Sequence, residues 1–379
     1  PLIQVLGTRS IPAFDGLLSA QSPSLPRPHR EYNPVMTRHL SRLHELDLLR
    51  GLACLMVVGF HYLYRGPVAG WSPVVPWAGF AEIARYGYFG VHLFFIISGF
   101  VILMSARHAS AREFVASRVA RLYPAYWPAV LLTWGLMNAT HFVEAPLSVR
   151  DLLVNLTMFP QWFHIEFVDG VYWTLAVELQ FYLLVWLVLK FGMMGKVQAL
   201  LGWWLLIAAL NLLRPISYLE IWLAARWAPF FCFGALVFLQ RVDGFSWQRA
   251  ALMLLAYGLA IDGVWGAVVQ ARHPELVADS PLLACLLVTG FFAAFWWIGT
   301  GRGRLPAWSW VTWAGALTYP VYLVHQNVGY VLLGQLTSSG WSVESALLVV
   351  LSAVFVTAWL LHMCAERPLA PRLKAWIRA

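Results

Sequence analysis

Two side chains suited to chemistry, Arg50 and His61, lie eleven residues apart in an otherwise apolar stretch. At about 100° per residue, eleven helical steps end about 20° beyond three full turns. Both side chains would therefore leave the same helix face, about 16 Å apart along the axis. Asp47, one turn before Arg50, is expected to pair with the guanidinium and hold it in place. A guanidinium suits phosphate binding, and an imidazole suits proton or acyl transfer near neutral pH.

Three further titratable side chains lie inside apolar stretches. Helical rise places His92 about 8 Å and Glu178 about 9 Å from one end of their stretches. His325 rises about 20 Å from the opposite end of its own stretch, which brings it level with His61. Ionisable groups are costly inside a bilayer, so four at one depth predict a buried reaction chamber. Taken singly, each histidine could instead be a hydrogen-bonded packing residue, and Glu178 could simply neutralise a positive neighbour.

A second candidate site is a pair of arginines, Arg118 and Arg121, at the start of another apolar stretch. They are three residues apart and share a helix face at the expected membrane surface. Paired guanidiniums there suit phosphate binding by charge-assisted hydrogen bonds. Anchoring of the helix end, or contact with anionic lipid, explains them equally well.

The elements that must position these residues are membrane helices. The 379 residues are 60% hydrophobic and only 12% charged, against roughly 25% charged in a soluble domain. Apolar runs of about 17–25 residues recur along the chain, which predicts an all-α, polytopic transmembrane helical bundle. We expect ten spans, at about 46–64, 87–105, 123–140, 172–190, 197–213, 224–240, 249–269, 281–299, 312–333 and 343–364.

The charge distribution predicts how these spans are oriented. With ten spans, 19 of the 26 basic residues fall on the side of the termini, which places both termini in the cytoplasm. Topology thus accounts for the net charge of +8, and no nucleic-acid partner is expected. The four cysteines, Cys54, Cys232, Cys285 and Cys364, fall within apolar runs, so neither a disulfide nor a metal site is expected.

Three regions follow from this pattern. Residues 1–45 are rich in Pro, Ser and Arg and predict a disordered basic cytoplasmic tail, within which Met36 could be the translated start. Residues 46–366 form the ten-helix membrane domain, and 367–379 a short basic cytoplasmic tail. The longest outer loop, about 141–171, carries Glu144, Asp151, Glu166 and Asp169 and is either a lid or a solvated connector.

Several motifs, in this order, resemble the membrane-bound acyltransferase family 3, whose members O-acylate polysaccharides, lipopolysaccharide and some antibiotics. The similarity covers about residues 44–370. The motifs that carry it are Asp47 to Arg50 with His61, Gly90 to Phe100, Arg118 to Pro124, Trp173 to Tyr182, Pro229 to Gly234, Tyr319 to His325, and Glu366 to Pro368. His92 departs from the pattern, because the family resemblance implies an acidic residue there.

The resemblance implies acetyl-CoA or another acyl-CoA as donor and no permanently bound cofactor. It maps the family's arginine and histidine motifs onto Arg50 with His61 and onto Arg118 with Arg121. These three arginines would hold the nucleotide phosphates at the cytoplasmic side. The acceptor would be a sugar or a lipid-linked oligosaccharide, at the cytoplasmic membrane of a bacterium.

Roles for the remaining residues follow as expectations. His61 would act as general base or carry the acyl group, with Glu178 orienting it. His325 and Tyr322 would donate hydrogen bonds to the developing oxyanion or to the sugar. We assign His92 and Arg226 to acceptor binding.

Other functions remain open at this stage. A flippase or exporter of a sugar or lipid would also use charges within the membrane, and a sensor or scaffold would need none of the Arg50–His61 geometry. An acyltransferase could also act on a small glycoside such as a macrolide.

Overall fold

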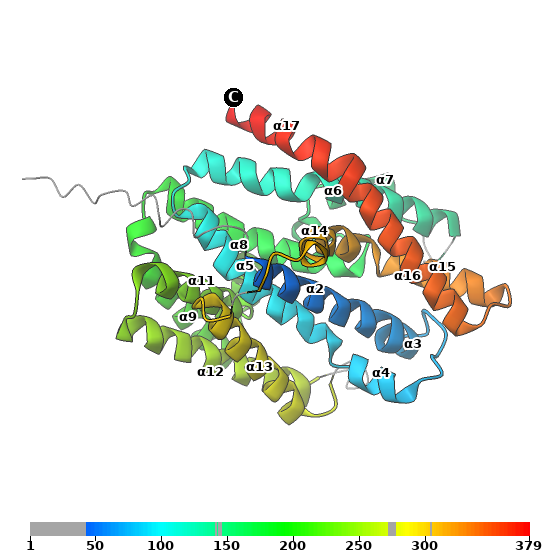
Figure 1. Cartoon of the computed structure of the whole chain (residues 1–379), viewed down its shortest axis with the longest axis horizontal. Helices are drawn as coiled ribbons and strands as arrows, with labels where there is room; N and C mark the ends of the chain where they lie inside the picture. Colours follow the sequence, from blue (N-terminus) through cyan, green and yellow to red (C-terminus); the bar gives the residue numbers. More distant parts are fainter. Residues whose placement is uncertain (1–42, 141, 143–145, 272–277, 304) are drawn as a thin grey trace, which may run out of the picture. The chain divides into compact units, whose positions relative to one another are not determined.

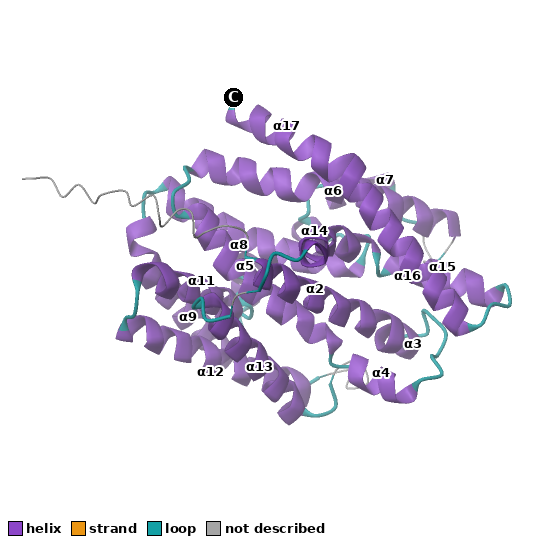
Figure 2. Ribbon diagram, in the orientation of Figure 1, coloured by secondary structure: helices purple, strands orange, loops and turns teal. Residues whose placement is uncertain are grey.

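The described part of the chain is helical, with no strand among residues 43–140, 142, 146–271, 278–303 and 305–379 (Figure 2). These are the residues that the computed structural model describes. They form one unit, Leu43–Ala379. The all-α prediction is therefore confirmed for them. The predicted tail lies outside the described residues up to position 42, and so do Met36 and Glu144.

Several of the long helices are joined by short helical turns. In chain order the helices are α2 (His44–Gly59), α3 (Gly66–Val68), α4 (Ala78–Ala84), α5 (Gly90–Ala106), α6 (Ala111–Thr140), α7 (Val149–Asn155), α8 (Trp173–Lys190), α9 (Val197–Leu213), α10 (Ser217–Leu223), α11 (Ala228–Asp243), α12 (Trp247–Val269), α13 (Pro281–Gly299), α14 (Ser309–Val324), α15 (Asn327–Ser338), α16 (Val343–Leu360) and α17 (Arg367–Arg378). Two π-helical turns are η1 (Phe60–Arg65) and η7 (Leu361–Glu366). The 3-10 turns are η2 (Gly87–Phe89), η3 (Pro160–Phe163), η4 (Gly170–Tyr172) and η5 (Met194–Lys196).

Eight helical segments of the described chain are long and apolar enough to cross a bilayer, against the ten that the sequence predicts. They are His44–Val68, Ala78–Ala106, Gly170–Lys190, Met194–Leu213, Ser217–Asp243, Trp247–Val269, Pro281–Gly299 and Val343–Arg378. The expected span at 123–140 is the second half of α6, a 30-residue helix whose first half carries several charges. The expected span at 312–333 is not continuous, because α14 ends at Val324 and α15 begins at Asn327.

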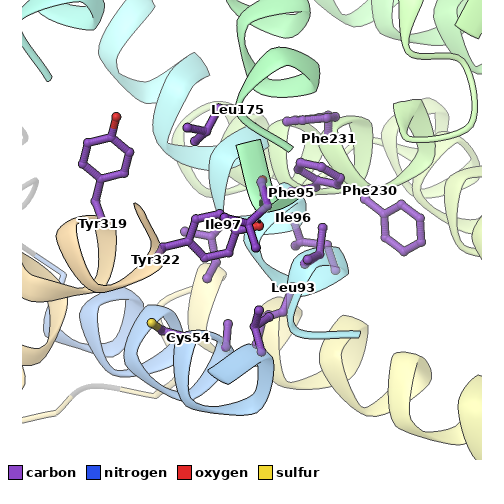
Figure 3. Packing of buried hydrophobic residues seen from close by; sticks show 14 of the residues in the cluster. Cys54, Leu93, Phe95, Ile96, Ile97, Leu175, Phe230, Phe231, Tyr319 and Tyr322 are labelled. Atoms are coloured by element: carbon purple, nitrogen blue, oxygen red, sulfur yellow. Dashed lines mark hydrogen bonds between the residues drawn. The ribbon is translucent and has the colours of Figure 1, made fainter. Parts of the chain in front are cut away.

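The central contact of the bundle is between α5 and α11. A Cβ atom at Gly99 would lie 2.0 Å from the carbonyl oxygen of Phe231, and one at Gly234 would lie 1.9 Å from that of Ile96. Only glycine allows the two backbones to approach so closely, as at many membrane helix crossings. Large rings fill the space around this crossing, with Phe95 and Phe231 4.8 Å apart between centroids (Figure 3).

Helix α2 packs against both α5 and α14 (Figure 1). Its contact with α14 is close enough that a Cβ atom at Gly315 would lie 2.4 Å from the Asp47 carboxylate. Both ends of α2 therefore lie against other helices, which fixes where the side chains of Arg50 and His61 project.

The stretch 367–379, expected as a short basic tail, forms helix α17 and packs along α6 (Figure 1). The Nε atom of Arg112 donates a hydrogen bond of 2.8 Å to the carbonyl oxygen of Ile377. Arg378 lies 4.0 Å from the Glu113 carboxylate. The end of the chain and the start of α6 are therefore on the same side of the bundle.

Candidate active site

The site lies at the interruption between α14 and α15, where His325 and Gln326 join two helices. An interruption frees carbonyl and amide groups from helical hydrogen bonds, which is costly in a bilayer unless other groups satisfy them. Here side chains from distant segments do so. Tyr62 donates a hydrogen bond to the carbonyl oxygen of His325, and Tyr172 donates one of 3.0 Å to that of Leu323. The interruption is therefore a stabilised part of the fold.

Asp169 stabilises the other side of this interruption. Its carboxylate accepts hydrogen bonds from the backbone N–H groups of Asn327, at 3.0 Å, and Val171, at 3.1 Å. It is fully buried, in the connection between α7 and α8. Burial raises the pKa of Asp169 from 3.8 to about 7, although the two backbone donors oppose this rise. The sequence indicated Asp169 only as one of several acids in a long loop.

His61 lies in the π-helical turn η1, at the end of α2. Such turns are rare and occur often at functional sites. Its Nδ1 atom lies 2.9 Å from the hydroxyl of Tyr330, which is on α15. The rings of His61 and His325 are 5.1 Å apart between centroids. The structure therefore brings together these two histidines, which come from opposite ends of the chain, as their expected depths predict.

Tyr322 is the third predicted residue of this cluster. Its ring lies 5.5 Å from that of His325, and its hydroxyl is 2.8 Å from the Oγ1 atom of Thr174 on α8. Figure 3 shows the Tyr322 side chain extending from α14 into the packed interior. The cluster of His61, His325, Tyr322 and Tyr330 is hereafter called the histidine cluster.

Glu178 is not part of the histidine cluster. Its carboxylate accepts hydrogen bonds from the hydroxyls of Ser98, at 2.6 Å, and Tyr182, at 2.9 Å. It also interacts electrostatically with Arg50. The hydrogen-bond partner of His61 is Tyr330, so the structure differs here from the expectation that Glu178 orients His61. The partner of Glu178 could not be expected from residue counting, because it depends on how α8 packs against α5.

His92 and Arg226 also lie apart from the histidine cluster. The His92 ring is enclosed by aromatic rings, among them Trp227 at 5.4 Å and Phe230 at 4.9 Å between centroids. Its Nδ1 atom is buried without a hydrogen-bond partner. Arg226 is exposed just before α11, with its backbone N–H donated to Glu220. These contacts do not connect either residue to His61.

The arginines gather at the other end of α2. Arg50 pairs with Asp47 at 3.3 Å, as the sequence predicts, and interacts electrostatically with Arg121. Arg121 forms an ion pair with the buried Glu366, whose second oxygen lies 2.8 Å from Nδ1 of His362. The sequence assigned no role to Glu366 or His362, although Glu366 belongs to the closing motif of the resemblance.

Arg118 meets different neighbours from Arg121 although they share a face of α6. Its guanidinium lies over the rings of Phe114 and Tyr182, at 5.7 Å from each centroid. It also donates a hydrogen bond of 2.7 Å to the hydroxyl of Ser117. Among the residues that the structure describes, no carboxylate forms an ion pair with Arg118, so its charge is available to an anionic ligand.

Comparison with known proteins identifies the family of the chain. The model of the family described as "Acyltransferase domain" matches residues 43–363, which is most of the chain. The chain therefore belongs to this acyltransferase family. It is also 24% identical over 316 residues to the exopolysaccharide production protein ExoZ of Rhizobium meliloti (strain 1021), covering 76% of this chain and 90% of that protein. No solved structure matches the chain significantly.

Proposed function

We propose that this membrane acyltransferase moves an acetyl group from acetyl-CoA to a sugar hydroxyl of an exopolysaccharide or of its lipid-linked precursor. The observation that carries the proposal is that different kinds of side chain surround the two ends of α2. Arginines gather around Arg50 at one end, and the histidine cluster surrounds His61 at the other. The printed name of the relative, an exopolysaccharide production protein, supports this class of acceptor.

The arginine end suits the phosphates of the nucleotide. Arg118 supplies donors that no described carboxylate occupies, and Arg50 adds a second positive charge. Arg121, which lies between the Glu366 carboxylate and the ring of Tyr319, contributes a third positive charge for the phosphates. The pantetheine arm would run along α2, over the roughly 16 Å between Arg50 and His61. The thioester would then arrive beside the histidine cluster.

The histidine cluster suits the transfer itself. His61 is half-buried and can take either a proton or the acyl group. Tyr330 fixes the orientation of its ring. We retain His92 and Arg226 as acceptor contacts in this proposal, at a distance from His61 that a sugar chain would have to bridge. We place the protein in a bacterial cytoplasmic membrane with both termini in the cytoplasm.

The proposal is tested with purified protein, radiolabelled acetyl-CoA and deacetylated exopolysaccharide as acceptor. Wild-type protein should transfer label to the polysaccharide. His61→Gln should lower the transfer rate at least 10²-fold, because an amide retains hydrogen bonding but cannot take a proton or the acyl group. Binding of acetyl-CoA should persist in this variant. Rapid transfer by folded His61→Gln, or no transfer by the wild type with any acyl-CoA, would contradict the proposal.

A flippase or exporter is the second candidate, because interrupted helices also form the binding sites of many transporters. The two functions differ in one measurable product. An exporter moves a lipid-linked sugar across vesicles without forming an ester, whereas the proposed enzyme esterifies the sugar. Mass spectrometry of the sugar after incubation with the reconstituted protein distinguishes them.

A further inference from the structure

One polar atom at the interruption between α14 and α15 has no partner. Tyr62 and Tyr172 satisfy carbonyl groups there, and Asp169 satisfies a backbone N–H group. The Nε2 atom of His325 is buried and has no hydrogen-bond partner, although His325 is 0% exposed. Buried polar atoms are normally paired, so this exception in an otherwise satisfied turn indicates a position that a ligand occupies.

The proton position on His325 follows from its other ring nitrogen. Nδ1 lies 2.9 Å from the carbonyl oxygen of Tyr322, and a carbonyl oxygen can only accept. Nδ1 therefore carries the proton, and Nε2 of the neutral ring keeps its lone pair. Nε2 can accept a proton but cannot donate one. This differs from the expectation that His325 donates a hydrogen bond to an oxyanion.

The surroundings of His325 decide how a ligand would approach it. Its ring is flanked by the rings of His61 and Tyr322. Tyr322 is buried and its hydroxyl is bonded to Thr174, whereas His61 is half-buried. Of the two rings that flank His325, that of His61 is therefore the more exposed.

We infer that His325 is the general base of the transfer and takes the proton of the acceptor hydroxyl through Nε2. This inference rests on the proposed function. It leaves His61 to carry the acyl group, with its Nδ1–H donated to Tyr330 and its Nε2 as nucleophile. Nε2 of His61 bonds to the thioester carbon as the carbon–sulfur bond breaks, and CoA leaves as a thiolate.

The second step restores both histidines. The sugar oxygen bonds to the acyl carbon, the bond from that carbon to His61 breaks, and the hydroxyl proton passes to Nε2 of His325. His325 then gives this proton up to water, and the released CoA thiolate takes a proton from water. The sum is one thioester and one alcohol converted to one ester and one thiol, with no further reactant.

The test compares His325→Asn with the wild type. The amide nitrogen of asparagine occupies the position of Nδ1, so the variant can still donate to the Tyr322 carbonyl while it lacks the basic nitrogen. Transfer to the polysaccharide should fall at least 10²-fold. Release of one equivalent of CoA in a single turnover, with the acyl label kept on the protein, should remain. If His325→Asn does not fold, the second variant is His325→Gln, whose amide nitrogen takes the position of Nε2 instead of that of Nδ1. His108→Asn, at an exposed position, controls for the substitution itself.

The outcomes separate the role of His325 as general base from the proposed function. Transfer by folded His325→Asn within threefold of the wild-type rate would overturn the role of His325 and leave the proposed function standing. Failure of that folded variant to release one equivalent of CoA would overturn the role of His325 too, because the base is needed only in the second step. Absence of transfer by the wild type would instead contradict the proposed function.

Discussion

At the scale of single residues, the paired arginines of α6 have different surroundings. Arg121 is tied to Glu366, a buried carboxylate that also contacts His362. Arg118 lies on aromatic rings and has no ion-pair partner among the described residues. Arg118 and Arg121 are therefore not equivalent, although they share one face of α6. Arg118 is the better candidate for direct phosphate contact, and Arg121 also holds α6 to the C-terminal helix.

This difference predicts distinct effects of two substitutions. Arg121→Ala leaves Glu366 buried without its cation and should lower the free energy of unfolding by about 1–2 kcal/mol, less than for a fully buried pair because the Arg121 side chain is 39% exposed. Arg118→Ala should instead weaken acyl-CoA binding by about 1.5–3 kcal/mol for each lost charge-assisted contact, with little change in stability. Thermal unfolding in detergent and ligand titration measure the two effects.

A double variant provides the control for Arg121. Glu366→Gln removes the charge that Arg121→Ala leaves unpaired, so adding it should recover part of the lost stability. Equal losses of stability in Arg118→Ala and Arg121→Ala would contradict the distinction.

At the scale of elements, the crossing of α5 and α11 depends on two glycines. Gly99→Ala would place a methyl group against the Phe231 backbone, and neither backbone can yield without separating the helices. We expect a loss of about 1–3 kcal/mol in unfolding free energy, the range for an overpacked core. Gly258→Ala on α12 is the matched control, because nothing lies within 4 Å of the added Cβ atom and alanine favours the helix. A Gly99→Ala variant as stable as Gly258→Ala would show that the crossing is looser than described.

Asp169, which accepts a hydrogen bond at the interruption between α14 and α15, should make the free energy of unfolding depend on pH. Its pKa is about 7 in the folded chain against 3.8 ordinarily, so the folded state retains a proton that the unfolded state releases. The stability from this group is fully present below pH 3.8 and is lost as the pH rises through about 7. Asp169→Asn cannot titrate and should flatten the change of melting temperature between pH 4 and 7. An unchanged pH profile in the variant would contradict this account.

At the scale of the whole described unit, α6 and α17 lie side by side. The 30 residues of α6 extend over about 45 Å. Its first residues contact α17 through Arg112 and Ile377. The segments 106–122 and 365–379 therefore lie on the same side of the bundle. The excess of basic residues predicts that this side is cytoplasmic.

Cysteine labelling in intact cells tests this topology. Single cysteines introduced within 106–122 and 365–379 should be protected from an impermeant reagent, and those within 146–171 should react. The background must first lose Cys364, which is the exposed cysteine among the four. Labelling of 106–122 from outside would place the arginines away from cytoplasmic acyl-CoA and remove the proposed donor site.

The sequence by itself determined the helical membrane class and the first pairings of the site. Apolar run length and helical period depend only on local composition, so the apolar helices and the Asp47–Arg50 pair were predictable, although the described residues contain eight candidate spans and not ten. The common face of Arg50 and His61 stays a prediction, because α2 is a regular helix only up to Gly59 and His61 lies in a π-helical turn. The approach of His61 to His325 followed from counting residues along two helices.

Only the tertiary structure decided where the helix at 312–333 is interrupted and which residues complete the site. Residues 325 and 326 are His and Gln, so no glycine or proline at these positions indicates the interruption. The backbone groups that the interruption frees are hydrogen-bonded by Tyr62, Tyr172 and Asp169, which lie far away in the sequence. Glu178 could not be separated from His61 beforehand, since its hydrogen-bond partners depend on how α8 packs against α5. Hydrogen bonds between distant segments are set by packing, which a single sequence read by local pattern does not contain.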